Sequence, residues 1–176
     1  MQKLPQLKQV RRGGNTWRFS ASRYFRKRHS KKYADRFVQG VDYEEIQHPL
    51  YKYRMICERV VKTQVYGRKI ITEFFVLYKD GRLRILGGYC WDGPSGPTID
   101  TPSFMRSSAV HDVLFQILRE GRVADGVRRD FFLLANSELR RISKIDGMWW
   151  PRYDIVKFAV DKFGAKHAAK NKELVA

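Results

Sequence analysis

The chain has 176 residues, with 35 Lys and Arg against 18 Asp and Glu, which gives a formal net charge of +17. A hydrophobic fraction of 43% supplies enough apolar side chains for a core, so the composition excludes a wholly disordered chain. Its only two cysteines, Cys57 and Cys90, exclude a fold held by a network of disulfides. The opening residues lack the apolar run of a signal peptide, and no stretch approaches the length of a membrane span. We therefore expect an intracellular protein, not exported by a signal peptide, whose positive surface attracts a polyanion.

Positive charge is concentrated at the start of the chain. Residues 1–36 hold twelve Lys and Arg against the single acid Asp35. Aromatic residues are interleaved with these bases, a mixture that can contact phosphates and stack on nucleobases. The sequence predicts a basic, aromatic-rich arm over 1–48 that binds nucleic acid or a protein partner, and an arm pinned to its own domain fits equally well. The candidate contact residues are Arg11, Arg12, Trp17, Arg18, Arg23, Arg26, Lys27, Arg28, Lys31 and Lys32.

The middle of the chain has the composition of β-structure. Three segments are rich in Val, Ile, Phe, Tyr and Thr, namely 53–66, 69–78 and 82–86. Gly67 and Gly81 fall between them, where glycine accepts the positive φ that tight hairpin turns impose. We therefore predict a small antiparallel β-meander over 53–86, followed by a Gly- and Pro-rich loop over 87–100.

Helical periodicity dominates the remainder of the chain. Thr101 and Pro102 begin the first helix in the favoured way, with a hydroxyl at the N-cap and proline in the first turn, and Gly121 ends it. The helices, which together occupy 102–163, are expected from 102, from about 125 to 142 and from 153 to 163. A short connection makes the first two an antiparallel pair. The prediction is an α+β fold with one domain over 49–165 and a flexible tail over 166–176.

His111 and Asp130 are expected to face each other across this helix pair. His111 lies ten residues before Gly121 and Asp130 nine after it, so both lie roughly 14 Å from the turn. Such a pair sets the imidazole tautomer and leaves the second ring nitrogen free as a general base. Asp112 is about 100° further round the helix, where it could join loop carbonyls as a ligand of Ca²⁺. A purely structural His–Asp pair, or an arginine preceding Asp130 as its counter-ion, fits the residues as well.

Over roughly residues 50–165, the chain resembles a family of uncharacterised proteins from bacteriophage and prophage genomes. The resemblance rests on WDGPSGPTIDTPSFMRSSAVHDVLFQILREG, RRDFF and WWPRYDIVKFAVDKFG, in which an Asp-Gly-x-Ser-x-Pro loop precedes a His-Asp helix, an Asp helix and an aromatic helix. The same order is similar, more remotely, to the active site of prokaryotic phospholipase A2. That second resemblance implies a phospholipase A2-like helical core with five residues in the site. They are His111 as general base, Asp130 as its orienting partner, and Asp112 with the carbonyls of Trp91 and Gly93 as the calcium ligands.

Two functions follow as expectations. The first is a bacteriophage-encoded, calcium-dependent acyl-ester hydrolase that acts on lipid and is attracted to anionic membranes. The second is a non-enzymatic component of the phage head or tail whose basic arm binds DNA or an acidic subunit. A nuclease that uses His111 ranks below both, because the visible acids do not form a two-metal cluster. The expected location is the host cytoplasm or the virion, since the chain lacks the disulfides of secreted phospholipases.

Overall fold

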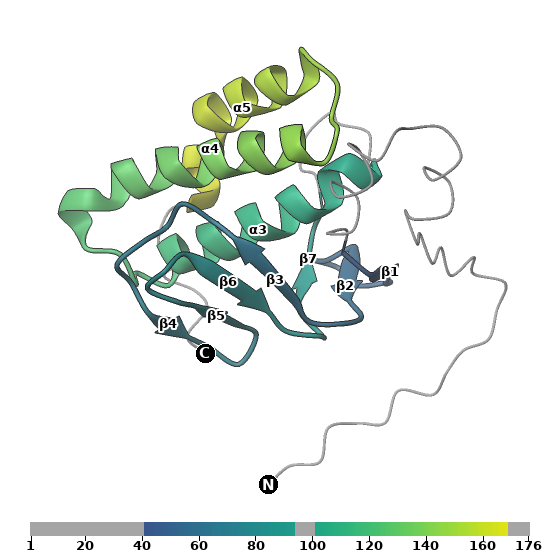
Figure 1. The fold of residues 1–176 in the computed structure, drawn as a ribbon, viewed down its shortest axis with the longest axis horizontal. Coiled ribbons are helices and arrows are strands. Elements are labelled where there is room, and N and C mark those ends of the chain that lie inside the picture. Colours follow the sequence, from purple (N-terminus) through teal and green to yellow (C-terminus); the bar gives the residue numbers. More distant parts are fainter. Residues whose placement is uncertain (1–40, 94–100, 169–176) are drawn as a thin grey trace, which may run out of the picture.

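The computed structural model describes residues 41–93 and 101–168. Within these ranges two antiparallel sheets and three α-helices form an α+β fold, which confirms the predicted class (Figure 1). The strands are β1 Tyr43–Glu45, β2 Tyr53–Met55, β3 Arg59–Lys62, β4 Ile70–Ile71, β5 Phe75–Leu77, β6 Arg82–Ile85 and β7 Cys90–Trp91. The helices are α3 Pro102–Arg119, α4 Arg128–Ile145 and α5 Arg152–Phe163, with 3-10 turns η1 Asp125–Val127 and η2 Gly164–Ala168.

The strand pairing differs from the predicted meander. The segment 53–66 is divided into β2 and β3, which belong to different sheets of order β1-β2-β7 and β3-β6-β5-β4. β3 pairs with β6 rather than with β4, in a register that places Val61 opposite Leu83. Both of these side chains are buried, so the pairing joins two apolar positions on one face of the sheet. The predicted pairing of 53–66 with 69–78 is therefore wrong, whereas the antiparallel pairing of 69–78 with 82–86 is present as β5 with β6. A glycine between two segments does not determine which strands pair.

One of the two predicted turns is a tight hairpin. Gly81 has a φ of +82°, its N–H donates to the carbonyl of Tyr78 at 3.0 Å, and β5 and β6 pair on either side. A Cβ at this position would lie 2.6 Å from the carbonyl oxygen of Thr63, so there is also no room for a side chain. Gly67 has a positive φ too, but its N–H donates to Lys79 across the sheet end. The Asp80-Gly81 turn is therefore confirmed, while Gly67 lies in a longer connection.

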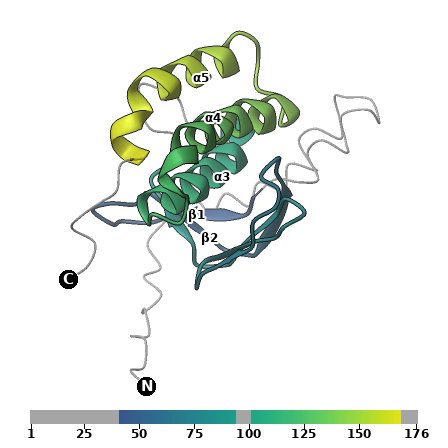
Figure 2. The ribbon, with the colours of Figure 1, turned by 90° about the vertical axis from the view of Figure 1, so that its left-hand side faces the viewer.

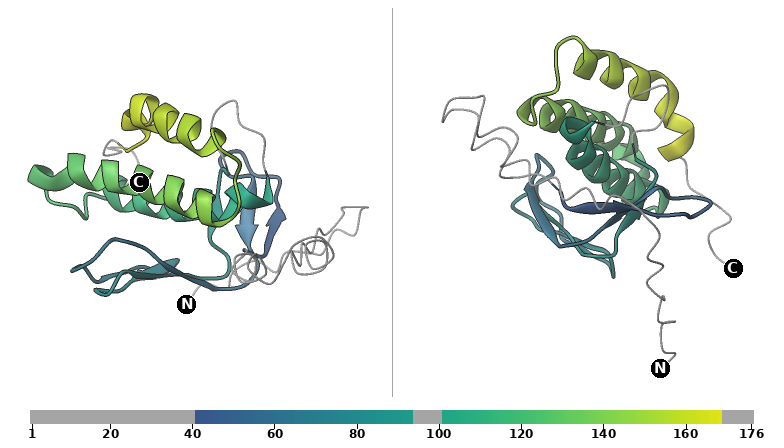
Figure 3. Two further views of the ribbon diagram at one scale, coloured as in Figure 1. Left: turned by 45° about the horizontal axis from the view of Figure 1, so that its top comes forward. Right: turned by 90° about the vertical axis from the view of Figure 1, so that its right-hand side faces the viewer.

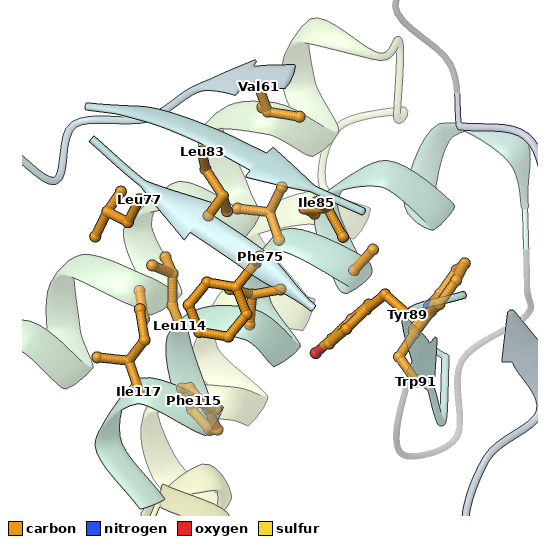
Figure 4. Close-up of a cluster of buried hydrophobic side chains, with 14 of the residues drawn as sticks. Val61, Phe75, Leu77, Leu83, Ile85, Tyr89, Trp91, Leu114, Phe115 and Ile117 are labelled. Carbon is orange, nitrogen blue, oxygen red and sulfur yellow. The ribbon is translucent and has the colours of Figure 1, made fainter. Parts of the chain in front are cut away.

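The main core lies between the four-stranded sheet and α3. Along β6, Leu83 and Ile85 are buried while Arg82 and Arg84 point outward, as the period of two along a strand requires. Figure 4 shows the apolar side chains of β5 and β6 gathered over those of α3, with Tyr89 and Trp91 closing one end. The Trp91 indole donates to the Ser108 hydroxyl at 3.2 Å, which ties β7 to α3. α3 is thus the central element, covered on nearly every side.

The helices stack in layers on the other side of α3. The Arg128 guanidinium, at the start of α4, donates to the carbonyl of Leu118 at 2.9 Å, while Arg106 near the start of α3 pairs with Asp146 just past the end of α4. These contacts at both ends confirm the antiparallel pair. α5 forms the outermost layer, packed on α4 and on the start of α3 (Figures 2 and 3). None of the described helices is long and apolar enough to cross a membrane.

The ends of the domain differ from their predicted positions. β1 lies inside the stretch assigned to the arm over 1–48, and η2 extends past the predicted start of the tail at 166. The ten candidate contact residues of the arm lie outside the described residues. Thr101 precedes α3 as predicted, but it makes no capping hydrogen bond and its hydroxyl instead accepts from Arg152 at 3.0 Å.

Candidate functional site

A buried hydrogen-bonded chain joins the three helices at His111. The Nε2 atom of His111, on α3, lies 2.8 Å from Oδ1 of Asn136 on α4. The Asn136 amide nitrogen in turn donates to Asp161 on α5 at 2.7 Å. Lys157, one turn earlier on α5, pairs with the same Asp161 carboxylate. His111 and Asn136 are both buried, so this chain holds the imidazole in the protein interior rather than at its surface.

The direction of these hydrogen bonds determines where the imidazole proton lies. The Asp161 carboxylate can only accept, so the Asn136 NH₂ group faces Asp161 and its carbonyl oxygen faces His111. The Nε2 atom of His111 must therefore carry the proton that it donates to Asn136. In the neutral ring the Nδ1 atom is then unprotonated, with its lone pair free to act as a base or ligand.

Two carboxyl groups meet on the Nδ1 side of the ring. Nδ1 lies 3.8 Å from Oδ1 of Asp112, whose side chain is 20% exposed. Asp92, directly after β7, contacts the Asp112 carboxyl through both its side chain and its backbone N–H. Two carboxyl groups in hydrogen-bonding contact must share a proton or a cation, because two carboxylates would repel. The site thus has an acidic pair on one side of His111 and an amide on the other.

Burial shifts the pKa values of the central groups. Desolvation lowers the pKa of His111 to about 4, although the Asn136 hydrogen bond and the charges of Asp92 and Asp161 act in the opposite direction. The pKa of Asp112 is raised well above its usual value by burial and by the neighbouring Asp92. At neutral pH the ring is therefore neutral, and the raised pKa of Asp112 favours the form in which its carboxyl group donates a proton to Asp92.

Asp130 is not the partner of His111, so that pairing was wrong. The link between the helices is longer than the predicted turn, because α3 ends at Arg119 and α4 begins at Arg128. His111 lies eight residues before the end of α3, and Asn136 lies eight residues after the start of α4. Asp130 precedes Asn136 by six residues, which places it about 9 Å away along the helix and about 120° round it. Its side chain is accordingly exposed.

The predicted calcium ligands are brought together only in part. Asp112 lies at the site, but the Trp91 carbonyl accepts the N–H of Lys52 at 3.1 Å in the pairing of β2 with β7. Gly93 has a φ of +79°, and a Cβ there would come within 2.5 Å of the Tyr53 ring, so it is needed for the close approach of the loop. Across 41–93 and 101–168, no group of three or more His, Cys, Asp or Glu side chains could hold a metal ion.

Three residues of the site were missed from the sequence. Asp92 belongs to the quoted loop motif, but the resemblance to phospholipase A2 assigns only the carbonyls beside it as ligands. Asn136 and Asp161 carry no motif. One feature of the sequence points to such partners: α3 carries four polar residues among apolar ones, namely Arg106, Ser107, Ser108 and His111. Polar side chains that are buried require polar partners on the neighbouring helices. Ser107 indeed accepts a hydrogen bond from Ser143 of α4 at 2.7 Å, in the same interface.

The lowered pKa of His111 predicts an acid-sensitive stability. The unfolded chain, with a histidine pKa of 6.5, binds the proton more readily than the folded protein, whose value is about 4. Stability is therefore complete above pH 6.5 and falls by up to about 3 kcal/mol as the pH drops towards 4. Urea unfolding in EDTA between pH 6.5 and pH 4 should show this decline in the free energy of unfolding. In His111→Gln, the part of the decline that comes from protonation of His111 should be absent. His48→Gln, at an exposed histidine, is the control. Equal slopes for wild type and His111→Gln would contradict the prediction.

Comparisons of the chain with protein-family models, curated proteins and solved structures found no match.

Proposed function

We propose that the protein is a hydrolase of acyl esters in which Nδ1 of His111 is the general base. The observation that carries the proposal is the hydrogen-bonded chain from Asp161 through Asn136 to Nε2 of His111. This chain directs the proton to Nε2, so the basic nitrogen is the one on the side of Asp112. A histidine held in one tautomer, with its free nitrogen beside a partly exposed carboxyl group, is the arrangement that activation of a water molecule needs.

The surrounding charges favour proton transfer during the reaction. As water attacks the ester carbonyl, Nδ1 takes one of its protons and the ring becomes an imidazolium. The imidazolium then returns this proton to the alcohol oxygen as the acyl C–O bond breaks, which releases the acid and the alcohol and restores the neutral ring. The carboxylates of Asp92 and Asp161 both stabilise that charge electrostatically. Asn136 is a positioning residue, because it holds Nε2 without touching the substrate. Phe115 packs its ring 4.0 Å from the imidazole, measured between ring centroids, and limits its movement.

We infer that a hard divalent cation such as Ca²⁺ would replace the proton between the two carboxyl groups, which would supply two of its oxygen ligands. Asp92 and Asp112 would hold it, and oxygen ligands are those that calcium prefers. When bound, the cation would polarise the ester carbonyl.

Hydrolysis by the full-length protein tests the proposal directly. Release of nitrophenol from a soluble short-chain nitrophenyl ester, and of fatty acid from phosphatidylglycerol in detergent micelles, would be followed with Ca²⁺ and with EDTA. We expect hydrolysis of both substrates in Ca²⁺ and a marked loss in EDTA. Calorimetric titration with Ca²⁺ alone should detect binding that Asp112→Asn abolishes. If neither substrate is hydrolysed under any of these conditions, the proposal fails.

The distribution of charge favours a second candidate function. Residues 1–40 carry twelve Lys and Arg and one acid, whereas 41–93 and 101–168 together carry 21 bases and 15 acids, a net charge of only +6. The charge thus lies mostly in residues 1–40 of the arm, as expected for a virion component that binds DNA or an acidic subunit through them. Fluorescence anisotropy with duplex DNA should then show salt-sensitive binding that is lost when residues 1–40 are deleted. Equal binding by the shortened chain would rule this version out.

A further inference from the structure

Large apolar side chains are exposed along α5 and on the turn before it. Five of them are more than 60% exposed, and we call them the α5 apolar face: Trp149, Trp150, Ile155, Phe158 and Phe163. α5 is the outermost layer of the helical side, so no other described element covers it (Figures 2 and 3). Exposed apolar residues that are clustered, rather than scattered singly, mark interaction surfaces.

The face is a consequence of the helix pattern. Tyr153 and Val156 are buried against α4 and the start of α3, and they anchor the inner side of α5. Ile155 and Phe158, three residues apart, share the opposite side. α5 is thus apolar on both its inner and its outer side, although only the inner side is needed for packing.

The charges around the face are positive or neutralised. The Lys162 ammonium lies 5.7 Å from the ring centroid of Phe158 and 5.5 Å from that of Phe163, which places a cation between two exposed rings. Both carboxylates of α5 are in ion pairs, Asp154 with Arg140 and Asp161 with Lys157. The surface therefore presents aromatic rings with the Lys162 ammonium at their edge.

The outer face of the four-stranded sheet provides a contrast. Val60 and Ile71 are also exposed, at 54% and 60%, but both are aliphatic. The same face carries the Arg84–Glu58 ion pair, with both partners substantially exposed to solvent. That surface has the mixed character of an ordinary solvated face.

We propose that the α5 apolar face docks on the surface of an anionic lipid bilayer. Tryptophan and phenylalanine insert favourably at the boundary between headgroups and acyl chains, and lysine at the edge of such a face binds anionic headgroups. Residues 41–93 and 101–168 carry a net charge of +6, which complements an anionic membrane, and the Lys162 ammonium places positive charge at the face itself. A nucleic acid would leave the aliphatic and aromatic side chains in water. The inference does not depend on the hydrolase activity.

Vesicle flotation with the full-length chain tests this surface. We expect binding to vesicles of phosphatidylglycerol and phosphatidylcholine, and much weaker binding to pure phosphatidylcholine. The double variant Ile155→Ser/Phe158→Ser should bind at least about tenfold more weakly, because two apolar side chains that enter the bilayer are lost. The matched control is Val60→Ser/Ile71→Ser, which removes as many exposed apolar side chains from the sheet and should bind as wild type does. Thermal unfolding of both double variants checks that they remain folded.

A second measurement needs no change in the apolar face. In a Trp17→Phe background, brominated lipids should quench the fluorescence of Trp149 and Trp150, while Trp91 is 1% exposed and stays unaffected. Three outcomes would overturn the proposal: absence of quenching, equal binding to both vesicle types, or flotation that persists in Ile155→Ser/Phe158→Ser but is lost on deletion of residues 1–40. A dimer in light scattering that the same double variant dissociates would assign the face to a second copy instead.

Discussion

His111→Gln is expected to lower kcat for the soluble ester by about 10²- to 10⁴-fold and to change KM by less than about twofold. Glutamine can still hydrogen-bond to Asn136, but it cannot take a proton from water. The substrate would therefore bind as before while the chemical step loses its base. Initial rates over a range of ester concentrations, in saturating Ca²⁺, separate the two constants.

Three further variants make this test specific. His48→Gln alters an exposed histidine and should retain the wild-type rate. Asn136→Ala should lower kcat, because Nε2 loses the acceptor that keeps the proton away from Nδ1. Asp130→Ala should leave kcat unchanged, since its exposed side chain lies on another side of α4. The reverse result, a loss with Asp130→Ala and none with Asn136→Ala, would contradict the site described above.

Arg106→Met is expected to lower the free energy of unfolding by about 3–5 kcal/mol, because it leaves a buried carboxyl without its charge partner. The Arg106 guanidinium donates to both oxygens of Asp146, at 3.0 and 2.5 Å, and both side chains are nearly inaccessible. Burial already raises the pKa of Asp146 to about 7, with Arg106 acting against that rise. Urea unfolding at neutral pH measures the loss.

The pH dependence of this variant distinguishes a buried charge from lost packing. Without Arg106 the folded protein keeps the proton on Asp146 to higher pH, while the unfolded chain releases it near 3.8. Stability is then retained at low pH and falls as the pH rises, so the deficit should be larger at pH 8 than at pH 5. Arg122→Met removes an exposed pair with Glu120 and should cost at most about 1 kcal/mol. A pH-independent deficit would show that Arg106 stabilises the fold through packing alone.

Short-range features of the chain could be predicted from its sequence. The α+β class, the antiparallel helix pair and the hairpin at Gly81 each depend on residues within a few positions of one another. α5 was expected over 153–163 and runs from Arg152 to Phe163. Helical periodicity and glycines in tight turns are local properties, so they can be recognised without knowledge of the tertiary structure.

Features that depend on the register between distant segments could not be predicted. β3 pairs with β6 because this pairing buries Val61 and Leu83 on one face of the sheet. The residues of the turns between neighbouring segments do not predict this pairing. The partner of His111 shifted from Asp130 to Asn136 because the connection between α3 and α4 spans eight residues, 120–127, rather than a tight turn. A shift of a few residues along a helix changes both the position of a side chain along the helix axis and the direction in which it points.

The sequence by itself determined that a histidine and an aspartate occupy adjacent positions of a central helix, close to a glycine-rich loop. Only the tertiary structure decided their surroundings. It placed Asn136 and Asp161 behind His111 and brought Asp92 against Asp112. The physical reason is that buried polar groups must be paired, and the packing of three helices and one loop selects which partners are within reach.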